Sequence, residues 1–181
     1  MKVAGFDPSL SNFGIAIADW NEQVGIVKIT ELHLVKTVSD KAGSPAEVVL
    51  RRSNELYRAA RQYAAGCELV FAELPTGGRN ASTAFALGAA CVATLVDFPT
   101  QVVTVGPYDV KRAVSNGLPS RQMDKEAIVA WAMKTHPEAP WPTYVRDGVT
   151  CPVTDVNHLE HLADAIAVIY AGIQKVKVKY E

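Results

Sequence analysis

The sequence predicts an α/β fold whose core is a mixed sheet of five strands, three antiparallel and two parallel, flanked by helices. Three apolar runs joined by short polar turns open the chain, and such short connections favour antiparallel pairing. Farther along, short apolar runs alternate with helical patterns, which is typical of parallel strands. The expected strands are residues 3–6, 13–20, 24–35, 69–72 and 101–105.

Capping residues predict where the helices begin. Ser44 suits the N-cap of a helix from Pro45 to about Ala65, because Pro45 fits the first helical position and Glu47 completes a capping box. Other helices are expected over residues 81–97, 108–114, 123–135 and from the N-cap Asn157 to about Tyr170. Residues 137–157 are expected to be irregular, and the basic tail after the last helix to be frayed.

Two predictions concern which side chains share a face. Alternation in the third strand places one set on one side and Lys28, Thr30 and Leu32 on the other. The first set is Val27, Ile29 and His33. In the first helix, the basic side chains are expected to form a solvated outer face. They are Arg51, Arg52, Arg58 and Arg61.

Composition places the chain among ordinary globular proteins. It has 181 residues, 49% of them apolar and 20% charged, which fits a single domain over residues 1–181. The net charge of -1 gives no general support for DNA binding, so a DNA partner would need local basic patches. Cys67, Cys91 and Cys151 lack zinc-site or disulfide spacing, which favours a reducing, cytoplasmic location. No membrane partner is expected, because no apolar run is long enough to span a bilayer and no signal peptide precedes the first strand.

Acidic residues follow two of the expected strands. Asp7 and Glu73 each come at the end of an apolar run. If the two strands are parallel neighbours, both carboxylates lie at the edge of the sheet where α/β proteins bind ligands. The last helix adds His161 and Asp164, which are three residues apart and therefore share one helix face. Asp164 precedes the apolar segment AIAVIYA, so burying its charge is unfavourable without a partner.

Taken singly, each acidic residue is better explained as a turn, cap or first-turn residue, and a backbone donor in the Pro8–Ser9 turn is another partner for Asp7. Their coincidence favours a metal site, because converging carboxylates repel one another unless cations lie between them. Oxygen-rich ligation with one imidazole suits Mg²⁺ or Mn²⁺ better than zinc. Two such ions per active site would activate a water and stabilise the leaving oxygen in phosphodiester cleavage.

Four segments resemble, in the right order, motifs of the RuvC-like Holliday junction resolvases of the RNase H-like superfamily. They are GFDPSLSNFGIAI, FAELPTGGRNASTAFALGAACVATLV, VGPYDVKRAVSNG and HLADAIAVI. Each match is weak alone, and the four together are specific. The resemblance implies an RNase H-like fold, a homodimer, and metal-dependent cleavage of four-way (Holliday) or other branched DNA.

The resemblance also implies roles for individual residues. Asp7 would bridge both metal ions, Glu73 would bind one, and Asp164 would bind the other. His161 stands beside Asp164, where some family members have Asp and others His, and its imidazole favours Mn²⁺. The DNA-binding residues that the resemblance implies are Arg79, Asn80, Lys111, Arg112, Arg121 and Lys125.

One position departs from the family pattern. Thr76 stands three residues after Glu73, where well-studied bacterial members carry an aromatic residue that wedges into the junction. Base stacking is unsupported there, which favours a phage-type or divergent member with looser specificity.

Several other functions remain open at this stage. A ribonuclease H or YqgF-type nuclease acting on RNA or a hybrid is the nearest rival, and a junction-binding protein that has lost hydrolysis is the non-enzymatic one. Actin-like ATPases and sugar kinases share a comparable opening motif, but they need two such domains.

Overall fold

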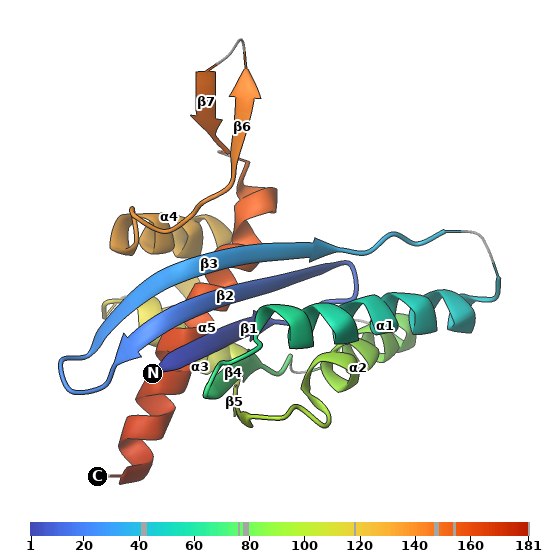
Figure 1. Ribbon diagram of the computed structural model, residues 1–181, viewed down its shortest axis with the longest axis horizontal. Helices are drawn as coiled ribbons and strands as arrows, with labels where there is room; N and C mark the ends of the chain where they lie inside the picture. Colours follow the sequence, from blue (N-terminus) through green and yellow to red (C-terminus); the bar gives the residue numbers. More distant parts are fainter. Residues whose placement is uncertain are drawn as a thin grey trace.

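The sheet has the strand order β3-β2-β1-β4-β5 (Figure 1). The computed structural model describes residues 1–40, 43–75, 77, 80–117, 119–146, 149–153 and 155–180. β1 pairs antiparallel with β2 and parallel with β4; β2–β3 is antiparallel and β4–β5 parallel. The mixed five-stranded sheet predicted from the sequence is therefore confirmed. Its strands are β1 (Lys2–Asp7), β2 (Asn12–Asn21), β3 (Ile26–Lys36), β4 (Leu69–Glu73) and β5 (Gln101–Val105).

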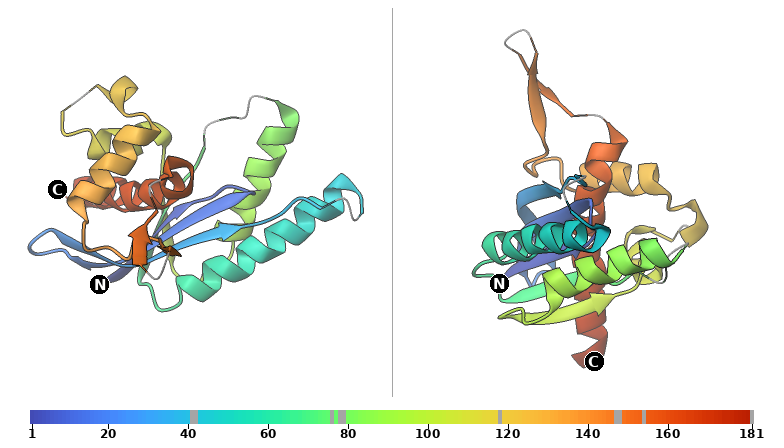
Figure 2. Two further views of the ribbon diagram at one scale, coloured as in Figure 1. Left: turned by 90° about the horizontal axis from the view of Figure 1, so that it is seen from above. Right: turned by 90° about the vertical axis from the view of Figure 1, so that its right-hand side faces the viewer.

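Helices cover both faces of the sheet, as the two turned views show (Figure 2). α1 and α2 lie on one face, and α3, α4 and α5 lie on the other. A separate hairpin of β6 (Thr143–Arg146) and β7 (Val149–Pro152) projects beyond the start of α5. The helices are α1 (Pro45–Tyr63), α2 (Ala81–Leu95), α3 (Pro107–Val114), α4 (Lys125–Thr135) and α5 (Val156–Tyr180), with a 3-10 turn at Ser120–Gln122.

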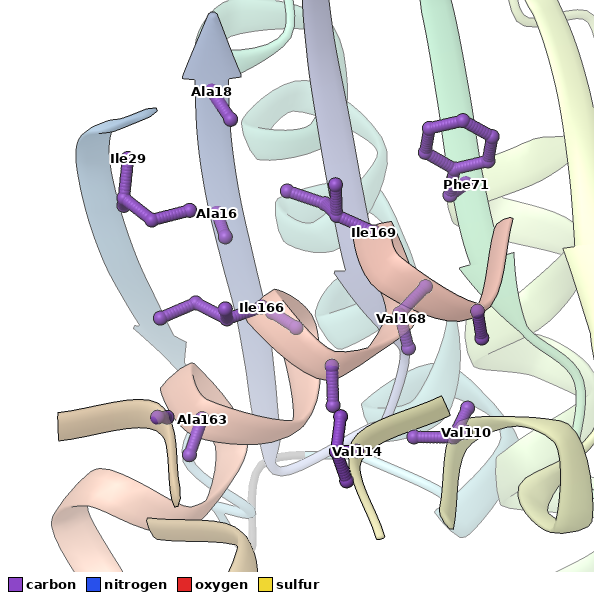
Figure 3. Close-up of a cluster of buried hydrophobic side chains, with 14 of the residues drawn as sticks. Ala16, Ala18, Ile29, Phe71, Val110, Val114, Ala163, Ile166, Val168 and Ile169 are labelled. Atoms are coloured by element: carbon purple, nitrogen blue, oxygen red, sulfur yellow. The ribbon is translucent and has the colours of Figure 1, made fainter. Parts of the chain in front are cut away.

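α5 is the helix that packs closest to the centre of the sheet. Figure 3 shows Ile166 and Ile169 of this helix beside the strands that carry Ala16 and Phe71, and all four side chains belong to one buried cluster. A Cβ atom at Gly14 would lie 1.9 Å from the His161 carbonyl oxygen, so the helix backbone occupies the place of a side chain. Glycine at this position therefore allows the α5 segment that carries His161 to lie directly against β2.

The opposite face has a second buried cluster. Leu56 and Ala60 of α1 pack there against Phe6, Ile15 and Val70 of the sheet. Ser44 caps α1 and Glu47 completes the capping box, as predicted from the sequence. Among the described residues of α2, only Ala90 and Thr94 are fully buried.

The start of α5 and the segment before it differ from the prediction. α5 begins at Val156, so Asn157 is inside the helix and not its N-cap. Asp155 takes the capping role: its carboxylate accepts a hydrogen bond from the Asn157 backbone N–H at 3.0 Å. The expected irregular segment contains the β6–β7 hairpin.

The basic tail is helical through Tyr180, so the expectation of a frayed end was wrong. Lys175 ties this part of α5 to the sheet, because its ammonium donates to the Thr104 carbonyl at 2.7 Å.

A bulge in β3 overturns the predicted alternation. Ala18 pairs with Ile29 while Ile17 pairs with Glu31, so Thr30 is an extra residue in the strand. Beyond the bulge, Leu32 joins the same core cluster as Ile29. His33 is on the opposite face, where its ring stacks on Tyr63 of α1 at a centroid distance of 3.9 Å.

At least three of the arginines on α1 are not simply solvated, and Arg51 is paired with the carboxylate of Asp40. Arg52 donates to the Thr37 and Ser11 hydroxyls, both at 2.7 Å, and so links α1 to the turn after β1. Arg61 donates to the Val96 carbonyl at 2.7 Å and lies over the Tyr57 ring. No helix in the described part of the chain has the length and apolarity needed to cross a bilayer.

Candidate active site

Three of the predicted acidic residues line one pocket at the carboxyl edge of the parallel strands. Asp7 ends β1 and Glu73 ends β4, and the parallel register pairs the preceding residues, Phe6 and Ala72. Asp164 reaches the same pocket from α5. The pocket has a volume of about 310 Å³ and is closed on its other side by α3 and α4. Topology therefore brings together carboxylates that lie far apart in the sequence.

The charges of these carboxylates disfavour one another. Burial, followed by repulsion from Asp7, raises the pKa of Glu73 to about 7, while nearby Lys111 opposes the rise. Burial, with repulsion from Asp7 and Glu73, raises the pKa of Asp164 to about 8. The pocket thus holds more negative charge than its surroundings stabilise, which is the condition under which a bound cation is favourable.

His161 contacts Asp7 directly. Its Nδ1 lies 2.6 Å from Asp7 Oδ2, and both side chains are less than one-fifth exposed. Burial is the largest single influence and opposes protonation of the ring, but the hydrogen bond to Asp7, together with the charges of Asp7, Glu160 and Asp164, raises the pKa of His161 above its ordinary value. In this arrangement His161 holds Asp7 in place instead of standing free beside Asp164.

The predicted DNA-binding residues divide into two groups. Lys111 of α3 and Lys125 of α4 line the carboxylate pocket. Arg112 instead faces its neighbour Asp109 at 3.5 Å, and Arg121 is exposed in the 3-10 turn. Asn80 caps α2, since its side chain accepts a hydrogen bond from the Thr83 N–H at 2.8 Å. Arg79 and Thr76, the position of the missing aromatic residue, lie outside the described residues.

The residue types around the pocket fit a hard divalent cation, because all three nearest acidic groups offer carboxylate oxygens. Among the residues that the structure describes, however, no three His, Cys, Asp or Glu side chains are arranged to hold a metal ion. The carboxylates surround the pocket without converging on one point, and Asp7 is engaged by His161. The donor chemistry suits a hard divalent cation, whereas the described side chains do not form a closed ligand set.

Sequence reasoning left two pocket neighbours without a role. Asp124 lines the pocket and also caps α4, since it accepts a hydrogen bond from the Ala127 N–H at 2.9 Å. Cys91 of α2 is close enough for Asp7 and Glu73 to raise its pKa, although burial is the larger cause. The capping position of Asp124 was visible in the sequence, but nothing there indicated that it faces the carboxylates.

Solved structures identify this arrangement of strands and helices. RuvC from Thermus thermophilus superposes with a TM-score of 0.68 at 24% identity, covering 99% of this chain and 97% of that one. RuvC from T. thermophilus in complex with a Holliday junction substrate gives a TM-score of 0.69 at 22% identity, with 98% and 96% covered. The chain has the RuvC fold.

A viral protein also matches this chain in structure. The fowlpox virus Holliday junction resolvase matches with a TM-score of 0.52 at 11% identity, over 97% of this chain and 99% of that one. No family model matches the sequence, and no curated protein matches it. The RNase H-like architecture inferred from the motifs is confirmed by these structures at the level of the fold.

Proposed function

We propose that the protein is a metal-dependent endonuclease that cleaves four-way and other branched DNA. The observation that carries the proposal is the pocket at the ends of β1 and β4, which combines three partly buried carboxylates with two lysines on a RuvC fold. Carboxylates suit the divalent cations of a phosphodiester hydrolase, and lysines suit the phosphate.

In this proposal Asp7, Glu73 and Asp164 would hold two Mg²⁺ or Mn²⁺ ions. His161 is proposed as an additional ligand beside Asp164, a role that requires its ring to leave Asp7. Bound cations supply an activated water and stabilise the leaving oxygen. Their charge also offsets the repulsion that raises the pKa of Glu73 and Asp164.

The lysines and the imidazole act on the substrate and on the carboxylates. Lys111 and Lys125 border the pocket, so a phosphate that enters it meets two ammonium groups. His161 keeps one Asp7 oxygen fixed at 2.6 Å until ligands arrive. Arg79, Asn80, Arg112 and Arg121 are proposed to contact the DNA arms outside the pocket.

A homodimer is proposed because resolving a junction takes two symmetric nicks, and the described residues of one chain form a single carboxylate pocket at the ends of β1 and β4. The exposed side of α2 is the proposed two-fold contact. Phe85 and Val92 are each 60% exposed, and Val96 is 51% exposed. Leu50 and Tyr57 of the neighbouring helix α1 extend the apolar surface. Covering such a patch with a second copy removes apolar area from water.

A cleavage assay tests this function. Wild type is incubated with a four-way DNA junction, a linear duplex of the same sequence and an RNA–DNA hybrid, each with Mg²⁺, Mn²⁺ or EDTA. We expect paired nicks in the junction with either ion, no cleavage in EDTA, and no cleavage by Asp7→Asn. Preferred cleavage of the hybrid would assign the protein to ribonuclease H-type activity instead. Cleavage in EDTA would contradict the metal mechanism.

A further inference from the structure

Glu160 occupies an unusual position for a carboxylate, because it is buried at the start of α5 and is only 9% exposed. One of its oxygens, Oε2, lies 2.6 Å from the ammonium of Lys125, which reaches it from α4. The other, Oε1, lies 3.4 Å from Nε2 of His161. A single side chain therefore contacts both a lysine and the histidine of the candidate site.

These contacts join four ionisable side chains in a row. Asp7 faces Nδ1 of His161, and Glu160 faces Nε2 of the same ring. Lys125 then closes the row and also lines the carboxylate pocket. The row connects β1, α5 and α4, the three elements that would have to keep their positions while a substrate binds.

The ion pair between Lys125 and Glu160 is asymmetric in exposure. The Lys125 side chain is 70% exposed, whereas that of Glu160 is 11% exposed. An exposed lysine has many rotamers, and holding it in one of them is entropically unfavourable. A buried carboxylate needs a cationic partner because its charge is poorly solvated. Glu160 therefore restricts the Lys125 ammonium to positions at the edge of the pocket.

The contact with His161 has a parallel consequence. A histidine whose two ring nitrogens both face carboxylates has its ring orientation fixed, in the way that outer carboxylates orient the histidines of metal sites. Glu160 is on the far side of the ring from Asp7. It therefore controls the direction in which His161 presents Nδ1 to Asp7.

We propose that Glu160 is a positioning residue of the site: it anchors Lys125 for the incoming phosphate and fixes the His161 ring against Asp7. The inference rests on the proposed nuclease function for its catalytic consequence, and on distances alone for its structural part. A preplaced Lys125 ammonium accelerates the reaction because it needs no reorganisation when the phosphate arrives.

The structural part is tested by NMR of the metal-free protein. Spectra of the imidazole nitrogens and lysine ammonium groups are compared for wild type, Glu160→Gln and the control Glu126→Gln. Glu126 is a matched control because it is an exposed carboxylate next to Lys125. We expect the His161 and Lys125 signals to move in Glu160→Gln and to stay in place in Glu126→Gln. Unchanged signals in Glu160→Gln would overturn the inference whether or not the protein cleaves DNA.

The catalytic part is tested by single-turnover cleavage and junction affinity for Glu160→Gln, Lys125→Met and the double variant. Glu160→Gln is expected to lower the cleavage rate about 10-fold or more, the usual effect of losing an outer partner of a site residue, while junction affinity changes little. Because Glu160 acts through both Lys125 and His161, the double variant should be slower than Lys125→Met by clearly less than the factor that Glu160→Gln costs on its own. Fully additive effects, or equal losses in rate and affinity, would overturn the assignment. Failure of wild type to cleave would contradict the proposed function alone, because the NMR comparison still decides whether Glu160 holds both groups.

Discussion

On one face of the sheet, α5 lies so close to β1 and β2 that glycine is required at both contacts, whereas on the other face α2 leaves large apolar side chains exposed. A Cβ at Gly5 would lie 2.1 Å from the Ala165 carbonyl, and one at Gly14 would lie 1.9 Å from that of His161. A Cβ at Gly88 of α2 would meet nothing within 4 Å. The difference teaches that the position of α5 is tightly fixed beside the candidate site, while this side of α2 is open to solvent.

The largest expected effect comes from the α5 face. Asp164→Asn should lower junction cleavage about 100- to 1,000-fold, as expected for loss of a group that stabilises charge in the transition state. Cleavage kinetics measure this directly. Near-normal cleavage by this variant would remove Asp164 from the site.

The same variant should be more stable than wild type in the absence of metal. Asp164 has an ordinary pKa of 3.8 in the unfolded chain and one of about 8 in the folded protein, so the folded state binds more protons between these values. Wild-type stability therefore falls as pH rises through that window, and the neutral Asn side chain avoids the loss. Melting temperatures without metal should be similar at pH 4 and diverge in favour of Asp164→Asn by pH 9. Added Mg²⁺ should reduce the difference by stabilising wild type.

Gly14→Ala should have the next largest effect, a loss of stability, because the added Cβ would overlap the α5 backbone at His161. Overpacking against backbone destabilises by about 1–3 kcal/mol, or roughly 2–4 °C per kcal/mol in a chain of this size. Calorimetry and cleavage assays should show a lower melting temperature and reduced activity together. Gly88→Ala is the matched control, and it should be neutral or stabilising by about 0.5–1 kcal/mol because alanine favours a helix interior. Equal effects of the two substitutions would contradict the contrast between the faces.

The sequence predicts the parts of the site that depend on strand ends, but not those that depend on how closely α5 packs on the sheet. Asp7 and Glu73 end apolar runs, and the rule that parallel strands end at one edge places them together without any knowledge of side chains. The hydrogen bond between His161 and Asp7 could not be predicted, because it depends on how closely α5 approaches β2 at Gly14. The predicted neighbour of His161 was Asp164, since helix spacing was the information available.

The fold shows the same division between local and long-range information. The antiparallel and parallel parts of the sheet followed from connection lengths, whereas the adjacency of β1 and β4 was only a condition of the prediction. The α1 capping box was read from local residues. The bulge at Thr30 was not predictable from alternation. An extra residue in a strand exchanges the two faces for all the residues that follow it, and no residue type in the sequence indicates where this happens. In the tail, KVKVK alternates like a strand, yet the segment continues α5 and is tied to the end of β5 by Lys175.

On the α2 face, substitutions should affect assembly more than folding. Val92→Glu places a charge on the exposed apolar patch and should convert a dimer to a monomer in analytical ultracentrifugation. The free energy of unfolding of the monomer should change by no more than about 0.5 kcal/mol. Val24→Glu is the control, since Val24 is 63% exposed in the β2–β3 turn, outside the α2 patch. An unchanged dimer in Val92→Glu would exclude α2 as the contact.

The smallest expected effect on cleavage concerns the polar link on the α1 face. Arg52→Met removes the hydrogen bonds to Thr37 and Ser11 and should destabilise by about 1–2 kcal/mol. Cleavage should fall slightly, because Ser11 belongs to the turn that follows Asp7. Arg58→Met, at an exposed position on the same helix, should change neither property. A larger loss of activity than that of Gly14→Ala would show that the α1 face also controls the site.

The central claim is that Asp7, Glu73 and Asp164 form one binding site for divalent cations. Anomalous diffraction from crystals grown with Mn²⁺ tests it most directly, because manganese is located without reference to activity. We predict anomalous peaks inside the pocket bounded by these three carboxylates, and their loss in Asp7→Asn crystals. Peaks elsewhere on the molecule, or an empty pocket at millimolar Mn²⁺, would contradict the account.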